Sequence, residues 1–479
     1  MIARLSFAPL VALAVTVAGC ASASPPGDGF SNVRRSVSDR SGHHVHWNRG
    51  SAADAQAAAS VRQLLAEPLS SEAAVQVALL NNATLQATYE DVGIAQAELV
   101  GAGLLHNPVF DAGLRFPEGG GSTKVDLTVV ADFLDVFQIP LRKRLAKTAL
   151  QTAELRTADA VLALAAEVRE AYADAVGAQQ LLELRRTVNE AASAAAEVAK
   201  RLHDAGNLTD LALASEQALA ESAQLELTSA EAEAQAARLR LGQLIGFVDD
   251  AWQLPLGLPE APRESFAADE LEATALKQRL DLRAAERRIS NAQQALGGAR
   301  QFGGVNELEL GGGAEREEGD WSFGPNLAIP LPFFNQGQAR IAAARAQLRR
   351  SRAQRDALIL QTGAEVRTAA AQLTAAQSRV ARLRDVVLPL RRRIVDETQL
   401  QYNAMDVGIF DLLRAKQDEV TAQAQHVAAL RDYWTARAKL ERAVGGQLPD
   451  GTPSTQPATA PAAPASAPAD AHQHHHHKH

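Results

Sequence analysis

Histidine is the residue type in this chain whose placement most directly suggests chemistry. Nine of the 12 histidines lie near the two ends of the sequence, at His43, His44, His46, His472, His474, His475, His476, His477 and His479. Neutral imidazoles clustered in this way bind Zn²⁺, Cu²⁺ or Ni²⁺. A Pro/Ala-rich linker precedes the last six and predicts a flexible, partly extended tail. We therefore expect weak metal binding by these tails. An expression tag or a functionless tail is the alternative, although Gln473 and Lys478 interrupt the run as a standard tag would not.

The single cysteine, Cys20, also has a distinctive position. Residues 1–19 carry Arg4 and an apolar stretch too short to span a bilayer, which is the form of a secretion signal. The small residues Val17-Ala18-Gly19 before Cys20 resemble the bacterial lipobox, in which the cysteine becomes the lipidated first residue, carrying acyl groups such as palmitate. In lipoproteins, Ala21 in place of Asp favours sorting to the outer membrane. One acyl chain anchors a protein only marginally, so we expect a second membrane contact. The alternative is an ordinary signal peptide with a chance cysteine.

The composition indicates which kind of secondary structure carries these residues. The chain has 479 residues, of which 46 % are hydrophobic but only 4 % aromatic, so Ala, Leu and Val carry most of the hydrophobicity. A chain rich in Ala, Leu, Glu and Arg is typical of long helices or coiled coils. One cysteine excludes a disulfide framework, and a net charge of −8 argues against a basic nucleic-acid binder. No apolar run reaches the ~18–20 residues of a transmembrane helix.

Two segments replace the helical pattern with alternating apolar and polar residues. Residues 107–134 and 305–331 each predict two strands of a β-hairpin joined by a glycine-containing turn. Each hairpin is preceded by a helix and followed by a long helical pattern, which begins at Leu141 in the first case and near Gln336 in the second. The same order of elements occurs twice, which indicates an internal duplication.

The duplication divides the chain into five parts. We expect a signal peptide, a lipidated N-terminal linker, a first repeat, a second repeat, and a Pro/Ala-rich linker with the His-rich tail. Their respective boundaries are 1–19, 20–69, 70–250, 251–446 and 447–479.

Aromatic residues are concentrated in the two hairpins. Eight of the 13 phenylalanines fall in residues 110–137 and 302–334, which contain the hairpins and their ends, and the rings expected in a membrane belt are Phe110, Phe116, Phe133, Trp321 and Phe323. Strands of this length, with an apolar outer face and rings near their ends, are typical of outer-membrane β-barrels. Solvent-facing hairpins with aromatic cores are the alternative. Four strands cannot close a barrel, and lipid tolerates no open sheet edge, so the sequence requires a homo-oligomer in which several chains contribute strands.

Three motifs and the duplicated order of elements resemble the TolC-like outer-membrane factor family. The motifs are Leu105-His106-Asn107-Pro108, Pro330-Leu331-Pro332-Phe333-Phe334-Asn335-Gln336-Gly337 and Gly408-Ile409-Phe410-Asp411-Leu412-Leu413-Arg414-Ala415-Lys416-Gln417. The resemblance implies a mainly α protein with a membrane β-barrel part: a homotrimer with a twelve-stranded barrel in the outer membrane and an α-helical tunnel in the periplasm. It also implies docking onto a periplasmic adaptor (membrane fusion) protein and an inner-membrane pump of the RND type, with no nucleic-acid partner.

The same resemblance indicates where a closed end and a docking surface lie. In the family, acidic residues after the second-repeat turn form rings that narrow the periplasmic aperture, and Asp411 and Asp406 are the candidates here. Three carboxylates near a threefold axis repel one another and attract cations. Arg414 replaces the second acidic residue of the family motif, and Asp411 could instead cap the following helix. The residues expected at the adaptor-docking tips are Gly206, Leu208, Leu211, Gly408, Ile409 and Leu412. Gly206 and Gly408 would supply the backbone freedom for the two reversals.

Charge is distributed unevenly along the predicted helices. Residues 204–233 contain seven acidic residues and no Lys or Arg, whereas residues 340–393 contain 13 Arg and three acidic residues. Such runs are usually solvated faces. In a helical tunnel these two segments could instead lie side by side as complementary neighbours.

The sequence offers no catalytic motif, since it lacks a phosphate-binding glycine loop, a nucleophile motif and a metal-binding Cys pair. We therefore expect no enzyme and no cofactor, but a passive conduit that exports a substrate from the periplasm or from an inner-membrane pump. The His-rich tails favour heavy-metal cations such as copper, zinc or cobalt, and the heavy-metal branch of the family. A drug-efflux channel of the same fold, a periplasmic adaptor, and a non-conducting metal-sequestering lipoprotein are the alternatives.

Overall fold

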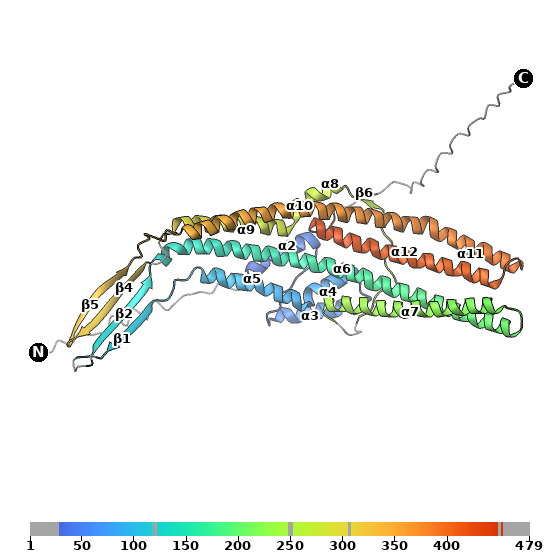
Figure 1. Ribbon diagram of the computed structural model, residues 1–479, viewed down its shortest axis with the longest axis horizontal. Coiled ribbons are helices and arrows are strands. Elements are labelled where there is room, and N and C mark those ends of the chain that lie inside the picture. Colours follow the sequence, from blue (N-terminus) through green and yellow to red (C-terminus); the bar gives the residue numbers. More distant parts are fainter. Residues whose placement is uncertain are drawn as a thin grey trace, which may run out of the picture.

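The computed structural model describes residues 28–116, 118, 122–247, 252–304, 308–448 and 452–453. The molecule is elongated, with a β-sheet at one end, long helices along its length and two helical turns at the other end (Figure 1). Its helices are α2 (Asp28–Ser41), α3 (Ala52–Leu64), α4 (Ser71–Asn81), α5 (Ala83–Gly101), α6 (Leu134–Asp204), α7 (Asp210–Ile245), α8 (Ala268–Gln278), α9 (Leu280–Gln301), α10 (Gln338–Arg382), the π-helix η1 (Leu383–Val387), α11 (Leu388–Asn403) and α12 (Ile409–Val444). Its strands are β1 (Val109–Arg115), β2 (Lys124–Asp132), β3 (Glu264–Ser265), β4 (Glu309–Glu317), β5 (Asp320–Ala328) and β6 (Thr452–Pro453).

Four of the strands form one antiparallel sheet in the order β1-β2-β4-β5. β1 and β2 form one hairpin and β4 and β5 the other, and β2 pairs with β4 to join the two repeats. At this junction Val129 lies opposite Gly312, and Ala131 lies opposite Leu310. Within the described residues, β1 and β5 each leave one edge without a neighbouring strand.

The central element is α6, which is 71 residues long and at 1.5 Å per residue extends over roughly 105 Å. It begins at Leu134, earlier than the expected start at Leu141. The reason is that Asp132 Oδ1 accepts a hydrogen bond from the Leu134 amide at 2.9 Å, and Pro140 is accommodated in the second turn. A helix of this length must bury a face along its whole extent, and α6 packs against α5, α7, α9 and α12.

The helices form a layer with two long sides (Figure 1). Next to the sheet, α5, α6, α9 and α10 lie side by side in that order, and next to the turns the order is α7, α6, α12 and α11. α5 and α7 therefore occupy one long side of the chain, and α10 and α11 occupy the other.

The N-terminal segment is folded, so the prediction that residues 20–69 form a linker is wrong for its described part. α2 and α3 are helices, and Phe30, Val33 and Val37 of α2 are buried at helical spacing. The Phe30 ring packs edge-on against Tyr89, with centroids 4.9 Å apart. The Ser, Gly and Ala content suggested a linker, but three correctly spaced apolar residues are enough to hold α2 against α6 and α5.

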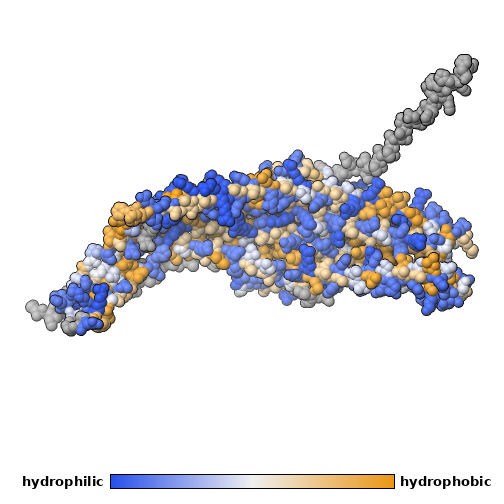
Figure 2. Space-filling view, viewed as in Figure 1, coloured by the Kyte–Doolittle hydropathy of each residue, from blue (hydrophilic) through white to orange (hydrophobic). Residues whose placement is uncertain are grey.

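The hydrophobic core lies in the middle of the molecule, where α2–α6, α8, α10 and α12 meet, and we call this region the waist. Its largest fully buried side chains include Trp252, Tyr89, Tyr433, Leu271 and Leu440. Many apolar side chains of the sheet are instead exposed, and Figure 2 shows hydrophobic residues gathered at the bend between the sheet and the helices. None of the helices in the described ranges combines the length and the hydropathy that a membrane crossing requires.

Candidate functional site

The sheet has one apolar and one polar face, which the strand register creates. Three rows cross the apolar face: Phe110, Val129, Gly312 and Pro325; Ala112, Leu127, Ala314 and Phe323; Leu114, Val125, Arg316 and Trp321. Because successive residues of a strand point to opposite faces, the rows between them form the other face, such as Gly113, Asp126, Glu315 and Ser322. An apolar outer face and a polar inner face are the pattern of an outer-membrane barrel wall.

The five aromatic residues expected in a membrane belt are all exposed in the single chain. Phe116 and Trp321 lie at the end of the sheet that carries the hairpin turns, and Phe133 lies at the end next to the helices. Trp321 stacks on Phe323 with ring centroids 6.2 Å apart. Aromatic rings therefore lie at both ends of the strands, and Phe110 on β1 and Phe323 on β5 lie within the strands themselves.

Asp135, which sequence reasoning did not single out, connects the first strand to α6. Its side chain is buried and accepts hydrogen bonds from the backbone amide of His106 at 3.0 Å, from the His106 ring, and from Arg142 at 3.1 Å. Arg142 also donates a hydrogen bond of 2.9 Å to the Leu104 carbonyl. The motif around His106 was the sequence signal for this junction, but the spacing of Asp135 within a long helix gave none.

At the first tip, between α6 and α7, the chain reverses at Gly206 as expected. Gly206 has a φ of +75°, and the amides of Gly206 and Asn207 donate hydrogen bonds of 2.7 and 2.8 Å to the last turn of α6. Leu208 is half-buried, whereas Leu211 is exposed. This tip therefore presents an apolar side chain to its surroundings.

At the second tip, between α11 and α12, Met405 takes the left-handed conformation with a φ of +65°. The amides of Met405 and Asp406 donate hydrogen bonds of 2.9 Å to the last turn of α11. Gly408 has a φ of −80° and is the extended N-cap of α12. The prediction that Gly408 permits this reversal is therefore wrong, because the chain reverses three residues earlier. Ile409 and Leu412 are half-buried, and Met405 is 93 % exposed.

Asp411 lies in the first turn of α12 and caps that helix. Its Oδ2 accepts a hydrogen bond of 3.2 Å from the Gly408 amide, which is the alternative role that the sequence left open. Asp406 is exposed in the turn just before it. The single chain thus brings two carboxylates to one end of the molecule.

A groove with a volume of about 110 Å³ lies between α6, α7 and α12 near the tips. Its lining includes Ala191, Ala195, Glu216, Leu219, Phe410, Arg414 and Lys416. The floor is mainly apolar, and Arg414 and Lys416 add positive charge to its rim.

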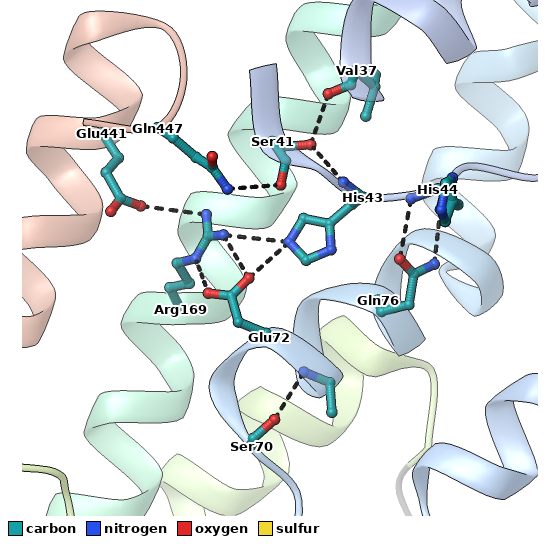
Figure 3. Close-up of polar contacts among 11 residues, drawn as sticks. Val37, Ser41, His43, His44, Ser70, Glu72, Gln76, Arg169, Glu441 and Gln447 are labelled. Atoms are coloured by element: carbon teal, nitrogen blue, oxygen red, sulfur yellow. Dashed lines mark hydrogen bonds and ion pairs between the residues drawn. The ribbon is translucent and has the colours of Figure 1, made fainter. Parts of the chain in front are cut away.

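A polar cluster at the waist holds the N-terminal segment against α6 and α12 (Figure 3). Arg169 of α6 donates hydrogen bonds of 3.2 and 3.0 Å to Glu72 of α4 and lies 3.5 Å from Glu441 of α12. The Nε2 atom of His43 is 2.9 Å from the same Glu72 carboxylate. The hydrogen bond from His43, supported by Arg169, lowers the pKa of Glu72 to about 2, while burial raises the pKa of Glu441. Sequence reasoning missed this cluster because Arg169 and Glu441 fit the polar positions of long helices.

The three N-terminal histidines lie in an ordered segment rather than in a tail. His43 belongs to the waist cluster, the backbone of His44 exchanges hydrogen bonds with Gln76, and His46 lies 2.6 Å from Asp54. Each histidine is thus held by a different partner. Among the described residues, no group of three or more His, Cys, Asp or Glu side chains is placed to hold a metal ion. Cys20, the predicted lipidation residue, and the histidines of 472–479 lie outside the described ranges.

The open sheet with an apolar face, continuous with two long helical hairpins, defines the chain as one subunit of an outer-membrane channel. The profile of the family "Outer membrane efflux protein" matches residues 271–446. The chain is 30 % identical to Protein CyaE of Bordetella pertussis over 353 residues, which are 67 % of this chain and 73 % of that protein. It is 25 % identical to the cobalt-zinc-cadmium resistance protein CzcC of Cupriavidus metallidurans over 396 residues, which are 79 % of this chain and 91 % of that protein. The chain therefore belongs to the outer membrane efflux protein family.

Solved structures show the same fold. The CmeC outer membrane channel of Campylobacter jejuni matches with a TM-score of 0.65 at 16 % identity, covering 81 % of this chain and 87 % of that chain. The predicted TolC-like fold and outer-membrane location are thereby confirmed. The protein is an efflux channel of the bacterial outer membrane with a long periplasmic helical portion, and such channels are passive conduits rather than enzymes. Channels of this family are trimers that work with an adaptor and an inner-membrane pump.

Proposed function

We propose that this channel exports heavy-metal cations as the outer-membrane component of a tripartite efflux system. The observation that carries the proposal is the likeness to CzcC, a cobalt-zinc-cadmium resistance protein, which extends over 91 % of that protein. The C-terminal histidines support it, because neutral imidazoles are ligands for Zn²⁺ and Cu²⁺. The RND type of pump and its periplasmic adaptor are the partners that this assignment implies.

The point where the C-terminal segment leaves the fold is consistent with a tail outside the barrel. β6 pairs with β3, with Thr452 opposite Ser265 and Pro453 opposite Glu264. This pairing lies beside α8, between the sheet and the tips (Figure 1). Pro453 therefore lies on the periplasmic portion of the protein, and a metal-buffering tail attached there would meet cargo before export.

Three copies of the chain together form the closed wall of the channel. The free edge of β1 in one copy pairs with the free edge of β5 in the next, and twelve strands then form a barrel without edges. The apolar face of each sheet faces lipid, and Phe116 and Trp321 at one end and Phe133 at the other form the two aromatic belts. The barrel supplies the second membrane contact that a lipid on Cys20 needs, because a single acyl chain anchors a protein only marginally.

The two tips serve as the periplasmic end of the conduit. Leu208, Leu211, Ile409 and Leu412 offer apolar contacts to an adaptor. In a threefold ring, Asp406 would bring three carboxylates towards the axis, where they repel one another and attract cations. Asp411 adds to this ring only through the oxygen atom that does not cap α12.

Deletion of the gene followed by growth on a panel of metals and drugs tests the cargo. We expect sensitivity to zinc, cobalt, cadmium or copper, restored by the full chain and restored less well by a chain that ends at Pro453. If a Cys20→Ala chain, present at the same protein level as the wild type, restored growth on metals fully, the result would contradict the proposed role of the lipid as an anchor.

Two results would overturn parts of the proposal separately. Sensitivity limited to dyes and antibiotics would remove the metal cargo and leave the channel intact. A purified trimer that never conducts ions in planar bilayers would remove the conduit itself.

A further inference from the structure

We infer that copies of this chain recognise one another by opposite charge, the acidic long side made by α5 and α7 of one copy binding the basic long side made by α10 and α11 of the next. The inference rests on the proposed ring of copies and identifies the surface that orders it. Within one chain the acidic run 204–233 and the Arg-rich run 340–393 do not lie side by side, because α7 and α11 are on opposite sides of the layer (Figure 1).

Near the tips, α7 carries an apolar stripe on the face that points away from α6. Its buried residues Ala223 and Ala230 mark the face towards α6. The opposite face repeats every seven residues, at Leu211, Ala218, Leu225, Ala232 and Leu239. All five are exposed, and Leu225 is 71 % exposed. A seven-residue repeat of Leu and Ala matches one of the two core positions of a coiled coil, and no described helix covers it.

The other long side has apolar residues at the same level. α11 exposes Leu390, Ile394 and Leu400. Like α7, α11 runs along the half of the molecule between the waist and the tips (Figure 1). A neighbouring copy placed side by side therefore brings the two exposed stripes together without changing either helix.

The half next to the sheet repeats this arrangement with α5 and α10. On α5, Ile94 is exposed on the face opposite the buried residues Leu85, Tyr89 and Val92. On α10, Ala346, Ala353 and Leu360 are exposed at seven-residue spacing. Small residues on one helix allow a larger side chain of the facing helix to interdigitate.

The charges on the two long sides have opposite signs. α5 contains three acidic residues and no Lys or Arg, and α7 contains six acidic residues and two Arg. α10 contains nine Arg and two acidic residues, and α11 contains three Arg and two acidic residues. One side is therefore negative in both halves. The other side is strongly positive next to the sheet, where α10 lies, and only weakly so near the tips, where Arg391 and Arg392 of α11 pair with acidic residues of α12.

Charged residues beside the stripes have no ion-pair partner in the described part of the chain. Asp91 and Glu98 are exposed on either side of Ile94 on α5. Arg349 and Arg352 are exposed beside Ala353 on α10. Elsewhere the chain pairs such groups readily, as Arg391 does with Asp418 at 2.8 Å. The unpaired groups of one side match the unpaired groups of the other.

Two different sides that bind head to tail make a heterologous interface, which closes into a ring when the rotation fits. Opposite charges select this arrangement, because two acidic or two basic sides repel each other. The same repulsion disfavours wrong neighbours, so charge gives direction and self-recognition while the apolar stripes supply burial.

Charge reversal on the full-length, detergent-solubilised protein tests the inference. One variant carries Asp91→Lys and Glu98→Lys, a second carries Arg349→Glu and Arg352→Glu, and a third carries all four changes. We expect the trimer fraction of each two-residue variant, measured by native mass spectrometry at low salt, to fall at least about tenfold. The four-residue variant, in which the two sides exchange charge, should regain most of the wild-type trimer fraction. Assembly of the wild type should weaken with salt as charges are screened.

The outcomes separate this inference from the proposed function. Equal trimer fractions in all four proteins overturn it, and so does a four-residue variant that stays monomeric with wild-type helicity by circular dichroism. A misfolded two-residue variant is replaced by the single changes Glu98→Lys and Arg349→Glu, read out in the same way. If the wild type is trimeric and none of the strains that carry these variants loses metal resistance, the result would contradict the metal cargo and would not affect the proposed interface.

Discussion

The waist and the sheet place similar side chains in opposite environments. At the waist, Phe30, Tyr89 and Tyr433 are buried in a core that one chain completes. In the sheet, Phe110 and Phe323 are exposed although the strands that carry them are fully paired within each hairpin. Large exposed apolar surfaces mark contacts with lipid or with partners. From this difference we expect the waist to be stable in the single chain and the sheet to depend on the membrane and on other copies.

Truncating one aromatic ring from each region tests this contrast most strongly. Tyr89→Ala should lower the free energy of unfolding by about 3–5 kcal/mol, because a large ring leaves a cavity in a closed core. Phe323→Ala should change it by less than about 1 kcal/mol in the solubilised single chain and should instead reduce insertion into membranes. Urea unfolding followed by circular dichroism, together with the membrane-bound fraction, measures both effects.

Tyr89→Phe is the matched control for this pair. The Tyr89 hydroxyl is buried without a hydrogen-bond partner in the part of the chain that the structure describes, so its removal should be nearly neutral. Equal destabilisation by the two alanine variants would show that the sheet, too, has a closed core.

The junction between the two regions should respond to Asp135→Asn with a loss of about 1–3 kcal/mol, because the buried carboxylate accepts hydrogen bonds from His106 and Arg142. Limited proteolysis should then cut faster near Leu104–His106. Asp111→Asn on the polar face of β1 is the control and should leave proteolysis unchanged. Slow cutting in both variants would mean that the junction does not depend on this carboxylate.

Lowering the pH should reduce the stability of the waist before it reduces that of the sheet. The pKa of Glu72 is lowered from 4.5 to about 2 in the folded protein, so its stabilising effect is present above pH 4.5 and is lost as the pH falls towards 2. The side chain is more than half exposed, and screening limits the effect to about 1 kcal/mol or less. Thermal unfolding from pH 7 to pH 2 should show a shallower decline for Glu72→Gln, while Glu67→Gln should follow the wild type.

The smallest effects concern the two tips. Gly206→Ala should cost about 1 kcal/mol, because a Cβ atom is disfavoured at positive φ. Met405→Gly should gain a few tenths of a kcal/mol up to about 1 kcal/mol by the same argument, and Gly408→Ala should be close to neutral. Differential scanning calorimetry ranks the three. A large loss for Gly408→Ala would contradict the reversal at Met405.

Periodicity in the sequence predicted the long helices, the two hairpins and the apolar face of the strands, because each of these depends on local spacing. The spacing of Ala, Leu and Val along 134–204 is enough to indicate α6. The packing of α2 was not predictable in this way, since it depends on how Phe30 meets Tyr89 more than fifty residues later in the chain.

The candidate site was predictable to a similar extent. Alternation identified Phe110, Trp321 and Phe323, and the turn motif identified Gly206. The left-handed residue of the second tip was missed because Met405 has no sequence preference for positive φ, whereas the nearby Gly408 does. The waist cluster was missed because its members, such as Glu72 and Glu441, come from distant helices.

The two long paths from the membrane end to the tips differ mechanically. α6 is one continuous helix from just after β2 to the first tip, with a proline only in its second turn, whereas the corresponding path in the second repeat is interrupted midway by η1, which Pro389 follows. A π-helical turn and a proline make a joint that can absorb torsion. We therefore expect a twist applied at the second tip to be absorbed halfway along the protein, and a twist applied at the first tip to reach the end of α6 next to the sheet.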